Sequence, residues 1–151
     1  MVDDDIDIRE LIALTLRHHG FDVVAVGDGT AAVATIVSEG ADALVTDLQM
    51  PGYGGLTLCR SLRALPTSLA LPIVVFTGVG KNDARVEVLR HMNDIRVLHK
   101  PKGLGQIAHA LMELTPTTAT GFGIAGNTRS SIDRARVSDP CRAGTASPIA
   151  R

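Results

Sequence analysis

The sequence predicts an α/β domain in which helices cover both faces of a parallel β-sheet. Short apolar runs alternate along the chain with segments of helical periodicity, and only a few residues connect them. The runs at 43–47 and 72–77 are almost wholly apolar, as expected of strands buried on both faces. With 45% hydrophobic residues among 151, the chain can form one domain with a core, and 3% aromatic residues make that core aliphatic.

Helix starts, helix ends and strand runs place the individual elements. Ile8 and Ile12 lie one helical turn apart, and Asp7 is the expected N-cap of that first helix. Gly20 and Gly40 suit the left-handed conformation that ends a helix. The expected helices are 8–19, 30–39, 56–65, 83–92 and 103–114, and the expected strands are 21–26, 43–47, 72–77 and 95–99.

The last part of the chain has a different composition. From residue 115 onward Thr, Ala, Gly, Ser, Pro and Arg dominate and no apolar period remains. Residues 115–151 are therefore expected to form a disordered, low-complexity tail, because they cannot bury enough surface to offset the entropy of ordering. Its scattered arginines favour a solvated tail over a nucleic-acid or membrane contact.

Composition also restricts where the protein acts. The formal net charge of −1 gives no overall attraction to nucleic acid or to an anionic membrane. No apolar run approaches the roughly 18 residues of a membrane span. The acidic N-terminus lacks the basic region of a signal peptide. We therefore expect a cytoplasmic protein without a membrane segment.

Acidic, hydroxyl and amine groups stand at the ends of the predicted parallel strands, and these ends open on one edge of the sheet. They are the acidic run 3–5, Asp47, Thr77 and Lys100. Clustered carboxylates repel one another and need a cation, and oxygen ligands without nearby Cys or His suggest Mg²⁺ or Mn²⁺. Because the lysine and the hydroxyl would receive phosphoryl oxygens, this edge suits phosphoryl transfer to Asp47.

Four motifs together resemble the receiver domains of response regulators. They are Val2-Asp3-Asp4-Asp5, Thr46-Asp47-Leu48-Gln49-Met50-Pro51-Gly52, Phe76-Thr77-Gly78 and His99-Lys100-Pro101. Each motif is weak alone, but their order and spacing match the family over residues 1–114. The resemblance implies a receiver domain at 1–114 with a flavodoxin-like, doubly wound five-stranded parallel sheet, strand order 2-1-3-4-5, whose first strand is truncated in this chain.

The resemblance also implies a Mg²⁺ site. Asp3 and Asp4 match the metal-binding acidic pair, and Asp4 is expected to be the direct ligand. Asp47 would bind the same ion, and Asp5 would be an accessory acid. Gln49 would contribute its backbone carbonyl. The cofactor expected from these ligands is Mg²⁺.

The other roles follow from the same resemblance. A sensor histidine kinase or phosphotransfer protein would donate the phosphoryl group to Asp47, while Thr77 bonds a phosphoryl oxygen and Lys100 pairs with its charge. Pro101 matches the family's cis proline. Phosphorylation would bias an existing equilibrium and signal to an unknown output protein. We expect no enzyme, and no nucleic-acid partner, because nothing after residue 114 has the periodicity of a helix-turn-helix.

Two features depart from the family's pattern. Only Met1 and Val2 precede the acidic run, whereas typical strands have about 5–6 residues. Each missing core side chain is worth about 1.5–3 kcal/mol when buried, so the expectation is an incompletely described N-terminus. Val97, three residues before Lys100, stands where receivers often have an aromatic residue. The coupling from Thr77 to the output surface is therefore expected to differ.

Three other interpretations remain open. The chain could be a degenerate receiver that acts only as a protein-binding module. A metal-dependent phosphohydrolase would usually have a second acid two residues after Asp47, where this chain has Gln49. A flavin-binding domain of the same topology would need a phosphate-binding loop at the position of the acidic run. Cys59 and Cys141 lack the spacing of metal ligands, and Cys59 is expected to be a buried apolar residue.

Overall fold

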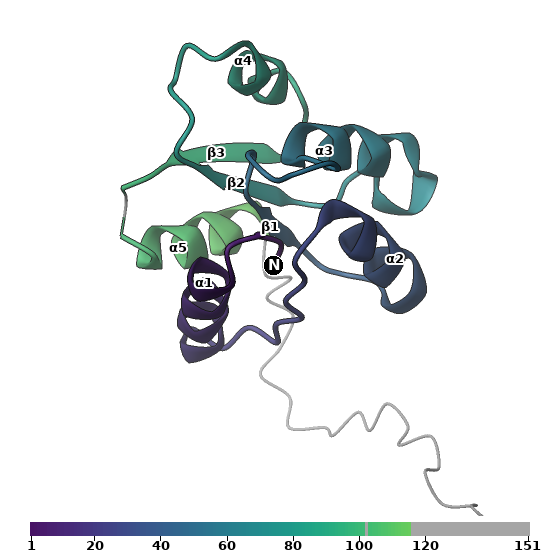
Figure 1. Cartoon of the computed structure of the whole chain (residues 1–151). Coiled ribbons are helices and arrows are strands. Elements are labelled where there is room, and N and C mark those ends of the chain that lie inside the picture. Colours follow the sequence, from purple (N-terminus) through teal and green to yellow (C-terminus); the bar gives the residue numbers. More distant parts are fainter. Residues whose placement is uncertain (102, 116–151) are drawn as a thin grey trace, which may run out of the picture. The chain divides into compact units, whose positions relative to one another are not determined.

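The computed structural model describes residues 1–101 and 103–115 (Figure 1). A parallel sheet of three strands, β1 (Leu44–Thr46), β2 (Ile73–Thr77) and β3 (Ile95–His99), lies at the centre in the order β1-β2-β3. The helices in these ranges are α1 (Ile6–His18), α2 (Gly29–Glu39), α3 (Gly55–Ala64), α4 (Ala84–Arg90), α5 (Gly105–Leu114) and the short 3₁₀ helix η1 (Pro66–Ser68).

Most of the predicted tail, residues 116–151, lies outside the described residues. None of the helices that the structure describes is long and apolar enough to cross a membrane.

Alternation along β2 divides the core into two layers. All five residues of β2 are buried. Ile73 and Val75 belong to an apolar cluster that includes residues of α2, α3 and α4. Val74 and Phe76 belong to a second cluster with residues of α1 and α5. The sheet is therefore covered on both faces, which confirms the predicted α/β class.

The first strand of the expected sheet is reduced to one residue. Val2 forms isolated parallel bridges to Val26 on one side and to Thr46 of β1 on the other. Its N–H donates to the carbonyl of Val45 at 2.8 Å, and its own carbonyl accepts from Asp47 N at 3.0 Å. Within the described residues the sheet therefore has three strands rather than the five that were expected.

The strand predicted at 21–26 was wrong. Only Val26 forms a bridge there, and residues 21–25 have no regular structure. A strand needs a neighbouring strand to pair with, and the described residues that pair with this segment are only Met1, Val2 and Asp3, whose N–H donates to Val26 O at 3.3 Å. Beside them, Met1 N donates to Val24 O at 2.8 Å and Val26 N donates to Met1 O at 2.9 Å.

A cavity of about 560 Å³ lies beside this short ladder. Its walls include the segments 20–24 and 39–45 together with Met1 and Leu111. Val24 on its wall is 53% exposed, although the sequence reads as an apolar strand at this point. The cavity therefore lies where a longer first strand would pack, at the amino edge of the sheet.

Helix α1 begins earlier than predicted. Asp5, not Asp7, is its N-cap, and Asp5 Oδ1 accepts from Asp7 N at 3.0 Å and from Ile8 N at 3.2 Å. The predicted end is confirmed, because Gly20 has φ +88° and Phe21 N donates to Leu16 O at 3.1 Å. Only two residues, Asp3 and Asp4, thus remain between the Val2 bridge and the α1 cap.

Candidate functional site

Asp47 stands at the carboxyl edge of the sheet, directly after β1. Its Oδ1 accepts from Leu48 N at 2.6 Å, and its side chain is largely buried. Thr46 donates its hydroxyl to the Asp47 carbonyl at 2.9 Å. A Cβ on Gly55, at the start of α3, would overlap that same carbonyl oxygen, so the loop can return so closely only with glycine there. The Leu48 N–H therefore holds one oxygen of the carboxylate, while Thr46 and the close approach of Gly55 hold the carbonyl of the same residue.

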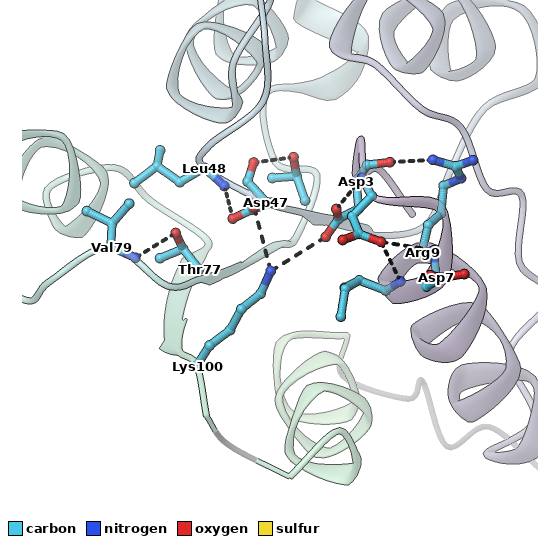
Figure 2. Close-up of polar contacts among 11 residues, drawn as sticks. Asp3, Asp7, Arg9, Asp47, Leu48, Thr77, Val79 and Lys100 are labelled. Atoms are coloured by element: carbon cyan, nitrogen blue, oxygen red, sulfur yellow. Dashed lines mark hydrogen bonds and ion pairs between the residues drawn. The ribbon is translucent and has the colours of Figure 1, made fainter.

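Asp3 and Asp4 follow the Val2 bridge and bring two more carboxylates to this edge. Asp3 is only 2% exposed, whereas Asp4 is exposed. Asp3 Oδ1 accepts from Asp5 N at 3.0 Å, and Arg9 Nη1 donates to the Asp3 carbonyl at 2.7 Å (Figure 2). Carboxylate oxygens of Asp3, Asp4 and Asp47 all lie within 4.8 Å of one another.

Lys100 lies between two of these acids. Its Nζ is 3.6 Å from Asp47 Oδ2 and 3.7 Å from Asp3 Oδ2 (Figure 2). The ammonium also lies 5.4 Å from the centre of the Phe76 ring. Lys100 follows β3, its N–H donates to Thr77 O at 2.7 Å, and the peptide to Pro101 is cis, as expected. One ammonium is thus shared by two carboxylates, at distances longer than a direct hydrogen bond.

The charges of the site do not balance. Burial raises the pKa of Asp3, and the neighbouring carboxylates of Asp47 and Asp4 raise it further. The Asp5 N–H and the Lys100 ammonium oppose that shift. Asp3 Oδ2 is buried without a hydrogen-bond partner among the described residues. Three grouped carboxylates, two of which face the Lys100 ammonium, therefore concentrate negative charge at this edge.

Thr77 ends β2 and is fully buried. Its hydroxyl oxygen accepts from Val79 N at 3.2 Å, so the hydroxyl is turned toward the following loop (Figure 2). Gln49 is exposed and lines a hollow of about 580 Å³ together with Asp4, Thr57 and Arg85. The structure thus brings Asp3, Asp4, Asp47 and Lys100 together directly, with Thr77 linked to Lys100 through the backbone.

Two residues of the site have roles that the sequence interpretation missed. Asp5, expected as an accessory acid, caps α1; its place three residues before Ile8 was the available signal. His99 is partly buried, and its Nδ1 lies 2.8 Å from the carbonyl oxygen of Val79. No local pattern could have shown this contact, because the two residues are 20 positions apart.

Helices on both faces of a parallel sheet, with acids and a lysine at its carboxyl edge, define the flavodoxin-like class of α/β domains. The family model described as the response regulator receiver domain matches residues 1–112. The chain belongs to this family, whose members act in two-component signalling. The resemblance noted in the sequence motifs is thereby confirmed.

Curated relatives give the same family. The chain is 39% identical over 78 residues to "DNA-binding response regulator MtrA" of Mycobacterium tuberculosis (strain ATCC 25618 / H37Rv), covering 52% of this chain and 33% of that protein. It is 41% identical over 86 residues to "Response regulator MprA" of Mycobacterium avium (strain 104), covering 57% and 37%. The chain therefore spans only about a third of the length of these relatives.

Solved structures support the fold. A response regulator receiver protein from Pseudomonas putida has a TM-score of 0.67 at 30% identity, covering 74% of this chain and 92% of that chain. The chemotaxis protein CheY4 of Vibrio cholerae has a TM-score of 0.68 at 24% identity, covering 75% and 93%. The flavodoxin-like receiver fold is thus shown, although the described residues form three strands.

The relatives correct one prediction. No nucleic-acid partner was expected, because residues after 114 lack the pattern of a DNA-binding module. The relatives named MtrA are DNA-binding response regulators, so that expectation was wrong. The aligned part covers a third of the MtrA chain, so the pattern of residues 115–151 could not decide whether such a partner exists.

Proposed function

We propose that residues 1–114 form a receiver domain that accepts a phosphoryl group on Asp47. The observation that carries this proposal is the position of the Asp47 carboxylate. It is held at the sheet edge, 3.6 Å from the Lys100 ammonium and within reach of the carboxylates of Asp3 and Asp4. The proposed donor is a phosphohistidine on a sensor histidine kinase or a phosphotransfer protein.

The two oxygens of Asp47 have different surroundings. Oδ1 is occupied by the Leu48 N–H, whereas Oδ2 faces Lys100. In the proposed step Oδ2 forms a bond to phosphorus while the P–N bond of the phosphohistidine breaks. The bonding electrons return to the imidazole nitrogen, which remains unprotonated or takes a proton from solvent. Lys100 offsets the charge on the phosphoryl oxygens, and Thr77 turns its hydroxyl to donate to one of them.

A divalent cation fits the remaining charge. The buried Asp3 Oδ2 without a hydrogen-bond partner and the three grouped carboxylates match the oxygen ligands that Mg²⁺ prefers. We propose that Asp3, Asp4 and Asp47, with the Gln49 backbone carbonyl, hold it. When bound, Mg²⁺ would neutralise phosphoryl charge during transfer. The residues themselves orient the Asp47 carboxylate and exclude water from Asp3.

Phosphorylation by a small donor tests the proposal. The whole chain, incubated with Mg²⁺ and acetyl phosphate, is expected to gain the mass of one phosphoryl group. Asp47→Asn should abolish this gain, because an amide oxygen is a poor nucleophile for phosphorus. Asp42→Asn is a matched control, since Asp42 is an exposed acid outside the carboxylate group.

The same measurement separates the alternatives. A folded wild-type chain that gains no mass would favour a degenerate receiver that only binds proteins. Rapid release of phosphate from an added phosphomonoester would favour a phosphohydrolase. Mass gained equally by wild type and Asp47→Asn would place the acceptor on another residue.

We also propose that this receiver controls a DNA-binding output. The observation that favours it is the name of the MtrA relatives, which are DNA-binding response regulators. Whether the output is carried on the same polypeptide or on a partner is tested by the length of the native protein on an immunoblot and by DNA co-purification. If the native protein is no longer than this chain and no DNA co-purifies with it, the proposal is contradicted.

A further inference from the structure

The peptide of Val79 is held from both sides by side chains at neighbouring strand ends. Its N–H donates to the Thr77 hydroxyl oxygen at 3.2 Å, and its carbonyl oxygen lies 2.8 Å from His99 Nδ1. Thr77 and His99 are themselves partners in the register of β2 and β3. The loop that follows Thr77 is therefore fixed to both strands through one residue.

The contact determines which nitrogen of His99 carries the hydrogen. A carbonyl oxygen can only accept, so Nδ1 must be the donor. In the neutral ring Nε2 is then an acceptor, and it is buried without a partner among the described residues. Leaving a buried acceptor unpaired is costly. The ring is thus placed for its contact with Val79 and not for solvation of both nitrogens.

The face of β3 on which His99 lies also bears on its role. Side chains two residues apart on a strand point to the same face, so His99 shares a face with Val97. Val97 packs against the apolar cluster that contains Val86 and Leu89 of α4. The ring of His99 lies on this face two residues closer to the site than Val97, and it contacts the loop after Thr77 directly.

We propose that His99 is the positioning residue that couples Thr77 to β3 through the carbonyl of Val79. This inference rests on the proposed phosphorylation of Asp47. When the Thr77 hydroxyl turns to a phosphoryl oxygen, the Val79 N–H loses its acceptor. The Val79 carbonyl stays bound to His99, so the loop pivots about this contact and displaces the end of β3.

Nitrogen NMR of the full chain tests the coupling. Beryllium fluoride with Mg²⁺ serves as the probe, because it mimics a phosphoryl group on a carboxylate. We expect Nδ1 of His99 to carry a hydrogen that is bonded to the Val79 carbonyl oxygen. Adding the probe should shift the amide of Val79 and the amides of β3. His99→Leu removes the donor, whereas His99→Asn retains an N–H near the place of Nδ1.

In His99→Leu, the Val79 and Gly80 amides should exchange with solvent roughly threefold to tenfold faster, which corresponds to the loss of one hydrogen bond. The probe should still shift the resonances of Asp47 and Thr77, but the response in β3 should be lost. His99→Asn should restore most of that response, and it provides the comparison if the leucine variant folds poorly.

Two results would overturn the coupling through His99. One is a ring with its hydrogen on Nε2, and the other is a β3 response in His99→Leu equal to that of wild type. In both cases Asp47 and Thr77 still respond to the probe, so the acceptor role survives. A wild-type chain in which neither residue responds would instead reject the acceptor role and the coupling together.

Discussion

The two edges of the sheet differ in how completely they are built. At the carboxyl edge, backbone hydrogen bonds of 3.0 Å from Asp47 N to Val2 O and 2.7 Å from Lys100 N to Thr77 O fix neighbouring strand ends. At the amino edge, a cavity of about 560 Å³ lies between the segment 20–24 and the residues leading into β1. Outside the three strands, Val2 is the one described residue with isolated bridges on two sides, to Val26 and to Thr46.

This contrast separates two requirements of the fold. The position of a side chain at a strand end depends on the last one or two residues of that strand and on their register. Stability depends on the length of the strand, because each added residue contributes a buried side chain and ladder hydrogen bonds. A single bridged residue can thus place Asp3 beside Asp47 while the opposite edge stays open.

Truncation of two phenylalanines measures the difference in packing between the two edges most directly. Phe76 is buried in β2 below Lys100, whereas Phe21 is partly buried and lines the cavity. Phe76→Ala should lower the free energy of unfolding by about 3–5 kcal/mol. Phe21→Ala should cost less than half as much. Urea unfolding of both variants gives the comparison, and equal costs would mean that the amino edge is as closely packed as the carboxyl edge.

Filling the cavity should reduce the contrast. An engineered variant with four apolar residues added before Met1 is expected to gain at least about 1.5 kcal/mol of unfolding free energy, the value of one fully buried side chain. A variant with four Gly and Ser residues is the control, since it adds chain without apolar surface. Equal unfolding midpoints for the two variants would show that the cavity does not accept a strand.

At the carboxyl edge, repulsion among the carboxylates is the main factor that lowers stability. Asp3→Asn keeps an oxygen acceptor for the Asp5 N–H but removes one carboxylate from the group of three. Without Mg²⁺ the free energy of unfolding of this variant should exceed that of wild type by about 1 kcal/mol, because less carboxylate repulsion remains. The variant should therefore unfold at a higher temperature. Mg²⁺ at one hundred times its Kd should stabilise wild type by about 2.7 kcal/mol. The same concentration should have little effect on the variant.

Thermal unfolding with and without Mg²⁺ checks this expectation. Asp42→Asn serves again as the control and should respond to Mg²⁺ as wild type does. Full stabilisation of Asp3→Asn by Mg²⁺ would remove Asp3 from the proposed ligand set.

The smallest expected effect concerns a thiol. Burial raises the pKa of Cys59 to about 12, so almost none of it is thiolate at neutral pH. In a Cys141→Ser background, an alkylating reagent should not modify Cys59 in the folded chain. Val24→Cys in the same background should react readily, because Val24 is 53% exposed at the amino edge. Rapid alkylation of Cys59 would show that the core under α3 opens.

Much of this architecture could be predicted because its signals are local. The run that became β2 is buried and rich in β-branched residues, β3 contains the apolar residues Ile95, Val97 and Leu98, and Gly20 ends α1 as its position indicated. Asp47, Thr77 and Lys100 could be placed together because parallel strands end on one edge. Their chemical roles in transfer remain proposals.

The missed features depend on contacts that a local pattern does not contain. Residues 21–26 have the composition of a strand, but a strand also needs a partner of similar length. Asp5 and Asp7 are both suitable helix caps, and Asp5 is favoured by its place three residues before Ile8 and by the short distance from the Val2 bridge to α1. The contact between His99 and Val79 joins the end of β3 to the loop after β2, and the two residues are 20 positions apart in sequence.

The shared ammonium of Lys100 has a thermodynamic consequence. Nζ faces Asp3 Oδ2 and Asp47 Oδ2 at nearly equal distances, so a phosphoryl group on Asp47 would draw this charge away from Asp3. Asp3 would then attract a divalent cation more strongly. Linkage makes the effect reciprocal, since the factor by which the phosphoryl group tightens cation binding equals the factor by which the cation favours the phosphorylated state. Cellular Mg²⁺ would therefore act as a partner in the signal, with Lys100 as the element that couples the two occupancies.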